Sequence, residues 1–183
     1  MIKNKFVILV NFLLLLIIVL NPVGSISARK DSSPYIISTR KIYTGKPYAS
    51  FTSLVNHEGR FYCAFREAKK HYDPSGEDVG VVKILYSKDG KRWQSFLTYS
   101  VDGIDLRDPK LTVTPEGKIM LLVEEVKYEK KVAVLRKTCV SFFSSNKLHT
   151  ELLPISFMSD MKWNWLWDIT WIEGTAYGYI YVP

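Results

Sequence analysis

Short apolar runs alternate with polar turns along most of the chain, and this pattern predicts antiparallel β-strands. One group of runs covers residues 51–55, 60–67, 79–87 and 93–99, and a second covers 109–113, 118–126, 132–143 and 148–157. A third group begins at Trp163 and ends with the run 176–182. Each run has the length of a strand and is bounded by turn-forming residues. The chain after residue 46 is therefore predicted to be all-β.

A Glu-Gly pair follows the first strand of each group. The pairs are Glu58-Gly59, Glu116-Gly117 and Glu173-Gly174, and they recur at nearly equal intervals. Such a pair favours a tight hairpin, because glycine adopts the positive φ angle that these turns need. A fixed period of this length, with four strands in each repeat, predicts a β-propeller. We expect four-stranded blades near 47–103 and 104–160 and the opening of a third at 161–183, after a lead-in segment at 29–46.

About two and a half blades do not close a propeller. A propeller removes its sheet edges by closing on itself, and each blade buries its faces against its neighbours. We therefore expect the missing blades to come from a longer chain or from other chains. The alternative is a truncated product without independent function.

Residues 1–28 have the pattern of a secretory signal peptide. Lys3 and Lys5 precede an apolar run from Phe6 to Leu20, and small residues follow at positions 25, 27 and 28. The apolar run is short for a membrane-spanning helix, which needs about 20 residues. We expect a secreted or periplasmic protein; membrane attachment through an uncleaved signal segment is the alternative.

Charge and cysteine content narrow the function classes. The formal net charge is +7, but Lys and Arg are scattered among acidic residues without a nucleic-acid-binding motif. Cys63 and Cys139 lie in strand-like runs at non-equivalent places of two repeats, so we expect buried free thiols; a disulfide is the alternative in an oxidising compartment. No Cys/His spacing typical of a metal site is present, and no cofactor motif is found. A nucleic-acid partner, a metal and a cofactor are therefore not expected.

The third group contains closely spaced tryptophans. Trp163, Trp165, Trp167 and Trp171 share one parity with Ile169, so in a strand they lie on one face. We expect this face to pack against a neighbouring blade. It would be exposed if that neighbour is missing, and a platform for stacking sugars is the other interpretation.

The turn from Ser87 to Trp93 resembles the Asp-box of sialidases, one residue shorter. Ser144-Ser145-Asn146, at the equivalent place of the second group, resembles a second, diverged copy. The order of motifs, from Ser53-Leu54-Val55 to the Asp-box, is similar to the first blade of exo-α-sialidases. The resemblance covers roughly residues 45–182 and implies a six-bladed propeller in a complete protein. The Asp-box itself is structural in that family.

The sialidase active site transfers only in part. The family's first substrate-binding arginine corresponds to Ser50 here, and the other arginines and the tyrosine nucleophile would lie in later blades. The resemblance implies an acid/base aspartate in the loop after the second strand, where Asp78 fits best and Asp73 is the second choice. His71 lies in the same loop and is a candidate for substrate binding.

Arg66 and Arg107 are candidates to replace the missing arginine and to bind an acidic sugar. Their alternative role is structural pairing with Glu67, Asp105 or Asp108. The triplet Arg107-Asp108-Pro109 also resembles one in five-bladed fructan and arabinan hydrolases, where its Asp stabilises the transition state, so Asp108 is a further substrate-binding candidate.

These observations leave different functions open. One is an exo-glycosidase acting on sialic-acid-type sugars, and another is a non-catalytic glycan-binding propeller module. In both cases a glycan or glycoconjugate is the expected partner.

Overall fold

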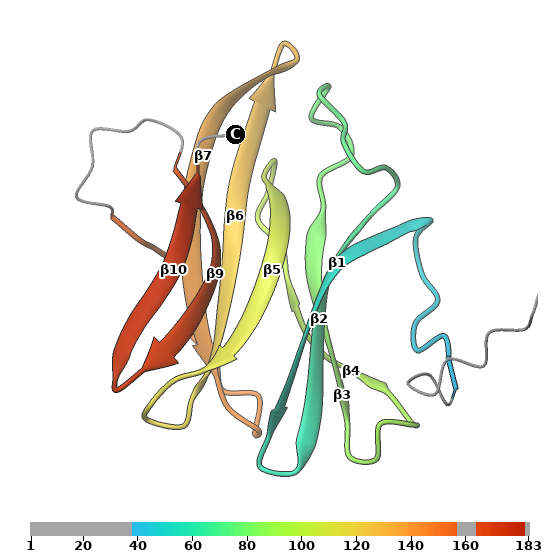
Figure 1. The fold of residues 1–183 in the computed structure, drawn as a ribbon. Coiled ribbons are helices and arrows are strands. Elements are labelled where there is room, and N and C mark those ends of the chain that lie inside the picture. The colour runs from blue at the N-terminus through green and yellow to red at the C-terminus, as the bar shows by residue number, and fades with distance from the viewer. Residues whose placement is uncertain (1–37, 157–163, 182–183) are drawn as a thin grey trace, which may run out of the picture. The chain divides into compact units, whose positions relative to one another are not determined.

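The computed structural model describes residues 38–156 and 164–181, and these residues form an all-β fold (Figure 1). The signal-like segment 1–28 and Trp163 lie outside the described residues. The remaining structure belongs to one compact unit that begins at Lys41. Among the described residues no helix is long and apolar enough to span a membrane, and no cluster of three or more potential metal ligands occurs.

Two four-stranded antiparallel sheets follow one another along the chain, each with its strands in sequence order (Figure 1). The first sheet consists of β1 (Tyr48–His57), β2 (Arg60–Ala68), β3 (Val81–Ser87) and β4 (Gln94–Tyr99). The second consists of β5 (Asp105–Val113), β6 (Ile119–Glu129), β7 (Val132–Phe143) and β8 (Leu153–Pro154). A hairpin of β9 (Trp165–Ile172) and β10 (Thr175–Tyr181) follows. This up-and-down order is that of propeller blades.

The predicted Glu-Gly hairpins are confirmed. Gly59, Gly117 and Gly174 all have positive φ angles, between 69° and 78°. Glu58 and Glu173 also have positive φ, as the two-residue hairpin turn of type I′ requires. The middle turn is longer, because residues 114–118 separate β5 from β6, and it is closed by a hydrogen bond from Gly117 N–H to Thr114 O.

Some predicted strand bounds are wrong. β6 extends to Glu129, beyond the predicted run 118–126, because its pairing with β7 continues to Val132. The predicted strand at 148–157 is reduced to the two residues of β8. Hydrogen bonds from Thr150 N–H to Phe142 O and from Ile155 N–H to Thr138 O still hold this segment beside β7, but without a continuous ladder.

The core lies between the two sheets. One face of β2, β3 and β4 meets the facing side chains of β5, β6 and β7. The cluster is composed of Tyr62, Ala64, Val82, Ile84, Phe96, Tyr99, Leu106, Leu111, Ile119, Leu121, Val123, Cys139 and Phe143. The rings of Tyr62, Phe96 and Phe143 contact one another with centroids 5.3 to 5.9 Å apart. The sheets are thereby fixed to each other, which fixes the site that lies between their first strands.

The opposite face of the first sheet is covered by the end of the lead-in segment. Cys63, Phe65 and Leu85 form a second small cluster with Tyr43 and Trp93. Tyr43 lies on Phe65, with ring centroids 4.7 Å apart, and its hydroxyl donates to Glu67. The described part of the lead-in segment, residues 38–46, forms no strand, but its end packs against the first sheet. Cys63 and Cys139 are both buried and free.

Candidate functional site

The first strands of both sheets contain an irregularity at equivalent positions. The pairing register of β1 with β2 shifts between Ser50 and Ser53, and that of β5 with β6 shifts between Arg107 and Lys110. Within these bulges Phe51 has a φ of 56° and Asp108 a φ of 46°. A bulge re-aims side chains, and positive φ in residues other than glycine is often found at functional sites. Phe51 and Asp108 thus occupy the same place in successive repeats.

A third position in the same period completes the pattern. The distance in sequence from Phe51 to Asp108, added to Asp108, gives Trp165 at the start of β9. All three side chains line one open cavity of about 360 Å³. The wall from the first sheet also contains His71 and Tyr72, and the wall from the hairpin also contains Trp167 and Tyr181. The floor comes from the second sheet and consists of Arg107, Asp108, Tyr128 and Arg136. The volume lies in the range typical of ligand sites.

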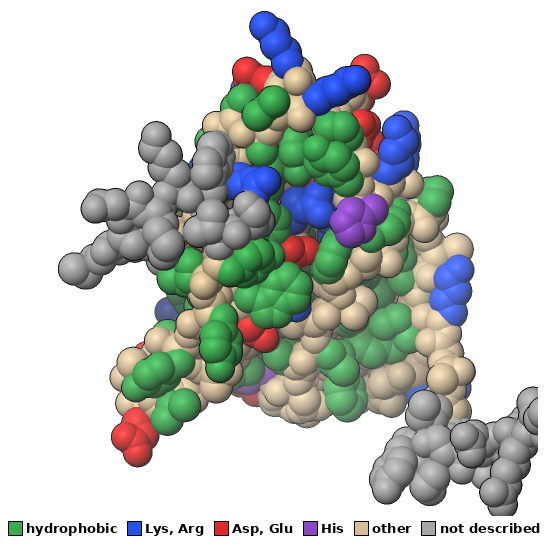
Figure 2. Space-filling view, turned by 45° about the horizontal axis from the view of Figure 1, so that its top comes forward, with side chains coloured by type: hydrophobic (Ala, Val, Ile, Leu, Met, Phe, Trp, Pro, Cys, Tyr) green, Lys and Arg blue, Asp and Glu red, His purple; other side chains and the backbone are tan. Residues whose placement is uncertain are grey.

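Figure 2 shows charged side chains among the hydrophobic ones on this face, with acidic and basic groups close together around a hollow. Aromatic rings dominate the walls. Arg136 lies over the Trp165 ring at 5.8 Å from its centroid, and Lys110 lies over Trp167 at 4.7 Å. Cations over indole faces are attracted by the ring's negative face, so the hairpin is held to the second sheet by charge as well as by burial.

Asp108 is the carboxylate on the cavity floor. It is 7% exposed, and its Oδ1 accepts no hydrogen bond from the residues that the structure describes. Burial raises the pKa of Asp108, and the positive charges of Arg107, Lys110 and Arg66 only partly offset that rise. A carboxyl group in this state is poised to hold a proton closer to neutral pH than an exposed one.

Glu124 lies behind the floor, on β6, and is 1% exposed. It is the cross-strand partner of Arg107. Its Oε1 accepts hydrogen bonds from the Thr138 hydroxyl and, at 3.2 Å, from Leu166 N–H, so it connects β6, β7 and β9. Burial raises the pKa of Glu124 to about 8, and the negative charge of Asp108 adds to the rise.

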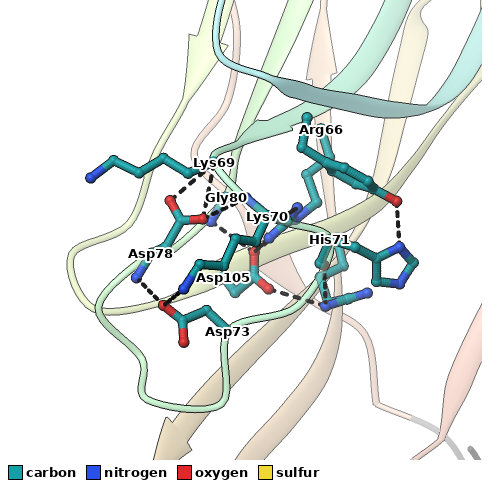
Figure 3. A network of polar contacts seen from close by, with 10 residues as sticks. Arg66, Lys69, Lys70, His71, Asp73, Asp78, Gly80 and Asp105 are labelled. Carbon is teal, nitrogen blue, oxygen red and sulfur yellow. Dashed lines mark hydrogen bonds and ion pairs between the residues drawn. The ribbon is translucent and has the colours of Figure 1, made fainter.

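Both candidate arginines converge on Asp105 (Figure 3). Arg66, fully buried on β2, donates from Nε to Asp105 Oδ1 at 2.9 Å, and its Nη2 lies 2.8 Å from the same oxygen. Arg107 donates from Nη1 to Asp105 Oδ2 at 3.2 Å. Of the two, only Arg107 lines the cavity. The structural-pairing alternative therefore holds for Arg66, while Arg107 is both paired and placed at the site.

Asp73 and Asp78 lie in the loop between β2 and β3, where both carboxylates accept hydrogen bonds from the loop backbone (Figure 3). Asp78 accepts from Lys69 N–H and Lys70 N–H at 2.8 to 3.1 Å. Asp73 accepts from the backbone N–H groups of Ser75 and Asp78, both at 3.2 Å. Neither lines the cavity. Their catalytic role stays a prediction, and their backbone contacts shape the loop that carries His71.

His71 is the loop residue that reaches the cavity. Its Nδ1 is hydrogen-bonded to the Tyr48 hydroxyl, and its ring contacts Tyr48 and Phe51 edge-on at centroid distances of 5.2 and 5.5 Å. These contacts leave Nε2 as the ring nitrogen available to a ligand. The predicted candidates His71, Arg107 and Asp108 are thus brought together, whereas Arg66 supports them from below.

The turn from Ser87 to Trp93 is closed by hydrogen bonds between its own side chains and backbone. Ser87 Oγ accepts from Gly90 N–H at 2.9 Å, and Asp89 Oδ1 accepts from Lys91 N–H and Arg92 N–H at 2.9 and 2.8 Å. These backbone hydrogen bonds lower the pKa of Asp89. In the second copy Asn146 Oδ1 replaces the carboxylate and accepts from Leu148 N–H at 3.1 Å. Both turns lie away from the cavity-lining residues.

Several site residues are not found by sequence reasoning. They are Phe51, Tyr72, Glu124, Tyr128, Arg136 and Tyr181. One signal is present in the sequence. The distance in sequence between Gly117 and Gly174 is the length of one repeat. The same distance separates Ser50, at the expected arginine position, from Arg107, and it separates Phe51 from Asp108. The arginine absent from the first repeat stands at the same position of the second.

No protein-family model and no curated protein matches the chain. Several solved structures match 56% of the chain. One has the description that the GH130 family of mannoside phosphorylases contains glycoside hydrolases that target β-1,2-mannosidic linkages in Candida mannan (16% identity, TM-score 0.38). Others are a glycosyl hydrolase from Bacteroides ovatus (15%, 0.39) and a protein described as a glycoside hydrolase from Parabacteroides distasonis (13%, 0.37). The match covers only 30 to 31% of each of those chains.

Proposed function

We propose that the cavity binds a glycan and that Asp108 donates a proton to the glycosidic oxygen. The observation that carries this proposal is a buried carboxyl group with a raised pKa on the floor of a cavity with aromatic walls. Glycosidic bond cleavage needs a carboxylic acid that remains protonated near neutral pH. Aromatic rings suit the C–H faces of sugars, because both surfaces are apolar and flat.

The charges around the floor favour an acidic sugar. Arg66, Arg107 and Arg136 face Asp105, Asp108 and Glu124. With a pKa of about 8, Glu124 is mostly neutral at pH 7. Arg66 and Arg107 share the single carboxylate of Asp105, which leaves a positive surplus beside the cavity while Asp108 is protonated. A sugar carboxylate, as in sialic acids, would offset it, and the sialidase-like motif order and the six-bladed architecture it implies are part of this proposal.

The test is turnover of a fluorogenic α-sialoside, with the matching neutral mannoside as comparison. Asp108→Asn should lower kcat/KM by about a hundredfold or more, the range expected for loss of a general acid. Asp78→Asn and Asp73→Asn should change it little, and Asp102→Asn, in an exposed turn, is the control. If Asp78→Asn abolishes turnover and Asp108→Asn does not, the acid is Asp78, as the family resemblance implies.

A specific observation also favours binding without catalysis. Glycosidases need a second group, either a nucleophile or a base. Among the described residues that line the cavity, Asp108 is the one carboxylate, and burial raises the pKa of the phenols of Tyr128 and Tyr181. Titration with sialyllactose, followed by tryptophan fluorescence, separates the two functions: binding without turnover supports the glycan-binding module.

Export and completion by further blades belong to the same proposal. The signal-like segment supports a secreted or periplasmic location. The test is to express the chain with its own N-terminus and to determine its location and N-terminal residue. A mature protein that begins near residue 29 outside the cytoplasm supports export, and a full-length cytoplasmic chain contradicts it.

A further inference from the structure

We propose that Asp105 is a positioning residue that sets the placement of Arg107 and of the His71 loop at the cavity. This inference rests on the proposed function, because it concerns the same site. Asp105 does not line the cavity and is 2% exposed, so it acts through its neighbours. It lies at the start of β5, just before the bulge that presents Asp108.

The two carboxylate oxygens of Asp105 accept hydrogen bonds from three different segments. Oδ1 accepts from Arg66 and, at 2.8 Å, from Gly80 N–H at the end of the β2–β3 loop. Oδ2 accepts from Arg107 on the cavity floor. One buried carboxylate therefore joins β2, the returning loop and β5. Charge-assisted hydrogen bonds of this kind are stronger and more directional than neutral ones.

Both arginines also hold the start of the loop. Arg66 Nη1 donates to Lys70 O at 3.0 Å, and Arg107 Nη1 donates to His71 O at 3.5 Å. Figure 3 shows Arg66, Lys70 and His71 close to Asp105. Displacing the carboxylate would therefore move a cation on the floor and an imidazole on the wall together. Both groups line the cavity that is proposed to bind the glycan.

Gly80 makes the close approach possible. A Cβ atom at this position would lie 2.3 Å from Arg66 Nε and 2.6 Å from Asp105 Oδ1, far inside normal contact distance. Leu106 N–H also donates to Gly80 O at 3.0 Å, which ties the loop to β5 by backbone as well. Gly80→Ala consequently disturbs the arrangement around Asp105 without changing any charge, which makes it an independent test.

The experiment compares Asp105→Asn and Gly80→Ala with Glu67→Gln. Glu67 is the matched control, because it is also a buried carboxylate paired with a cation, Lys83 at 3.7 Å, but it does not line the cavity. The quantity is the ratio of kcat/KM, or of affinity if only binding occurs, for an acidic and a neutral glycoside with the same aglycone. Asp105→Asn and Gly80→Ala should lower this ratio about tenfold or more, because only the acidic glycoside uses the charge of Arg107 for binding. A general loss of folded protein would lower the apparent kcat/KM for both glycosides in proportion and leave their ratio unchanged.

If the native chain neither binds nor cleaves the glycosides, only the proposed function fails. The role of Asp105 is then tested by a measurement that needs no ligand. In NMR spectra, Asp105→Asn should shift the Arg107 Nε–H and His71 ring signals, and Glu67→Gln should not. If Asp105→Asn does not fold, Gly80→Ala decides by the same signals. Unchanged Arg107 and His71 signals in a folded variant, or an unchanged acidic-to-neutral ratio in an active one, overturn the assignment.

Discussion

Replacing Glu124 by glutamine should make the protein more stable at high pH and remove much of its pH dependence. Burial raises the pKa of Glu124 from 4.5 to about 8, so the folded protein keeps a proton that the unfolded chain releases. The stability contributed by this proton is complete below pH 4.5 and is lost as the pH rises through about 8. A glutamine keeps the shape of the protonated acid but has no proton to lose.

The size of the effect follows from the two pKa values. Their difference of about 3.5 corresponds to about 5 kcal/mol over the full range, at about 1.4 kcal/mol for each pKa unit. Between pH 5 and pH 8 the native protein should lose on the order of 3 kcal/mol through this group. The glutamine side chain can still accept hydrogen bonds from Thr138 and Leu166 N–H, so Glu124→Gln should match the native protein near pH 5 and exceed it by a similar amount at pH 8.

The assay is urea unfolding followed by tryptophan fluorescence at several pH values from 5 to 8.5. Glu129→Gln is the control, since Glu129 lies on the same strand but is exposed and paired with Lys127 at 2.7 Å. Subtracting the native curve cancels groups with the opposite sign, such as Asp73 and Glu67, whose pKa values are lowered. If Glu124→Gln and the native protein lose stability in parallel between pH 5 and 8, Glu124 does not carry a proton in the folded state at neutral pH.

Further predictions concern the core, a thiol and a turn. Leu121→Ala, at a fully buried position, should lower the free energy of unfolding in urea by about 3 kcal/mol, whereas Leu153→Ala on the exposed β8 should cost far less. Cys139 should resist iodoacetamide at pH 8 until the chain is unfolded, because burial and Glu125 raise its pKa to about 12; rapid alkylation of the native protein would contradict this. Gly90→Ala should cost about 1 kcal/mol in the same urea assay, because Gly90 has a φ of 66°; an unchanged midpoint would show that the turn relaxes.

The strands and tight turns could be predicted from the sequence because their causes are local. Glycine at a turn and a period-two apolar pattern act within a few residues, and β2 and β7 appear close to where the pattern places them. The prediction for β8 is wrong because only two of its residues pair with β7, and an apolar run does not reveal that. The tryptophans of β9 share a parity but differ in environment. Trp165 is 6% exposed, whereas Trp167 is 40% exposed although Lys110 of the second sheet lies over its ring.

The candidate site was only partly predictable because its causes are distant. His71, Arg107 and Asp108 could be selected by residue type and motif. The bulges that aim Phe51 and Asp108 carry no glycine to mark them. The raised pKa of Glu124 depends on its burial in the folded protein, which leaves no local signal in the sequence. The loop acids Asp73 and Asp78 have the residue type of a catalytic group, but only the three-dimensional structure reveals the backbone amides that they bind.

The core that lies between the two sheets has a consequence for how the chain is made. Neither sheet can bury its inner face alone, since Tyr62 and Ile84 are covered from one side by Leu121 and Phe143 of the other. During synthesis the first sheet therefore leaves the ribosome with its inner face exposed to solvent. Its packing is completed only when Phe143 at the end of β7 has been added. The two sheets should form in one cooperative step rather than one after the other. Translational pausing or a chaperone acting before the second sheet is complete would thus affect the whole site at once.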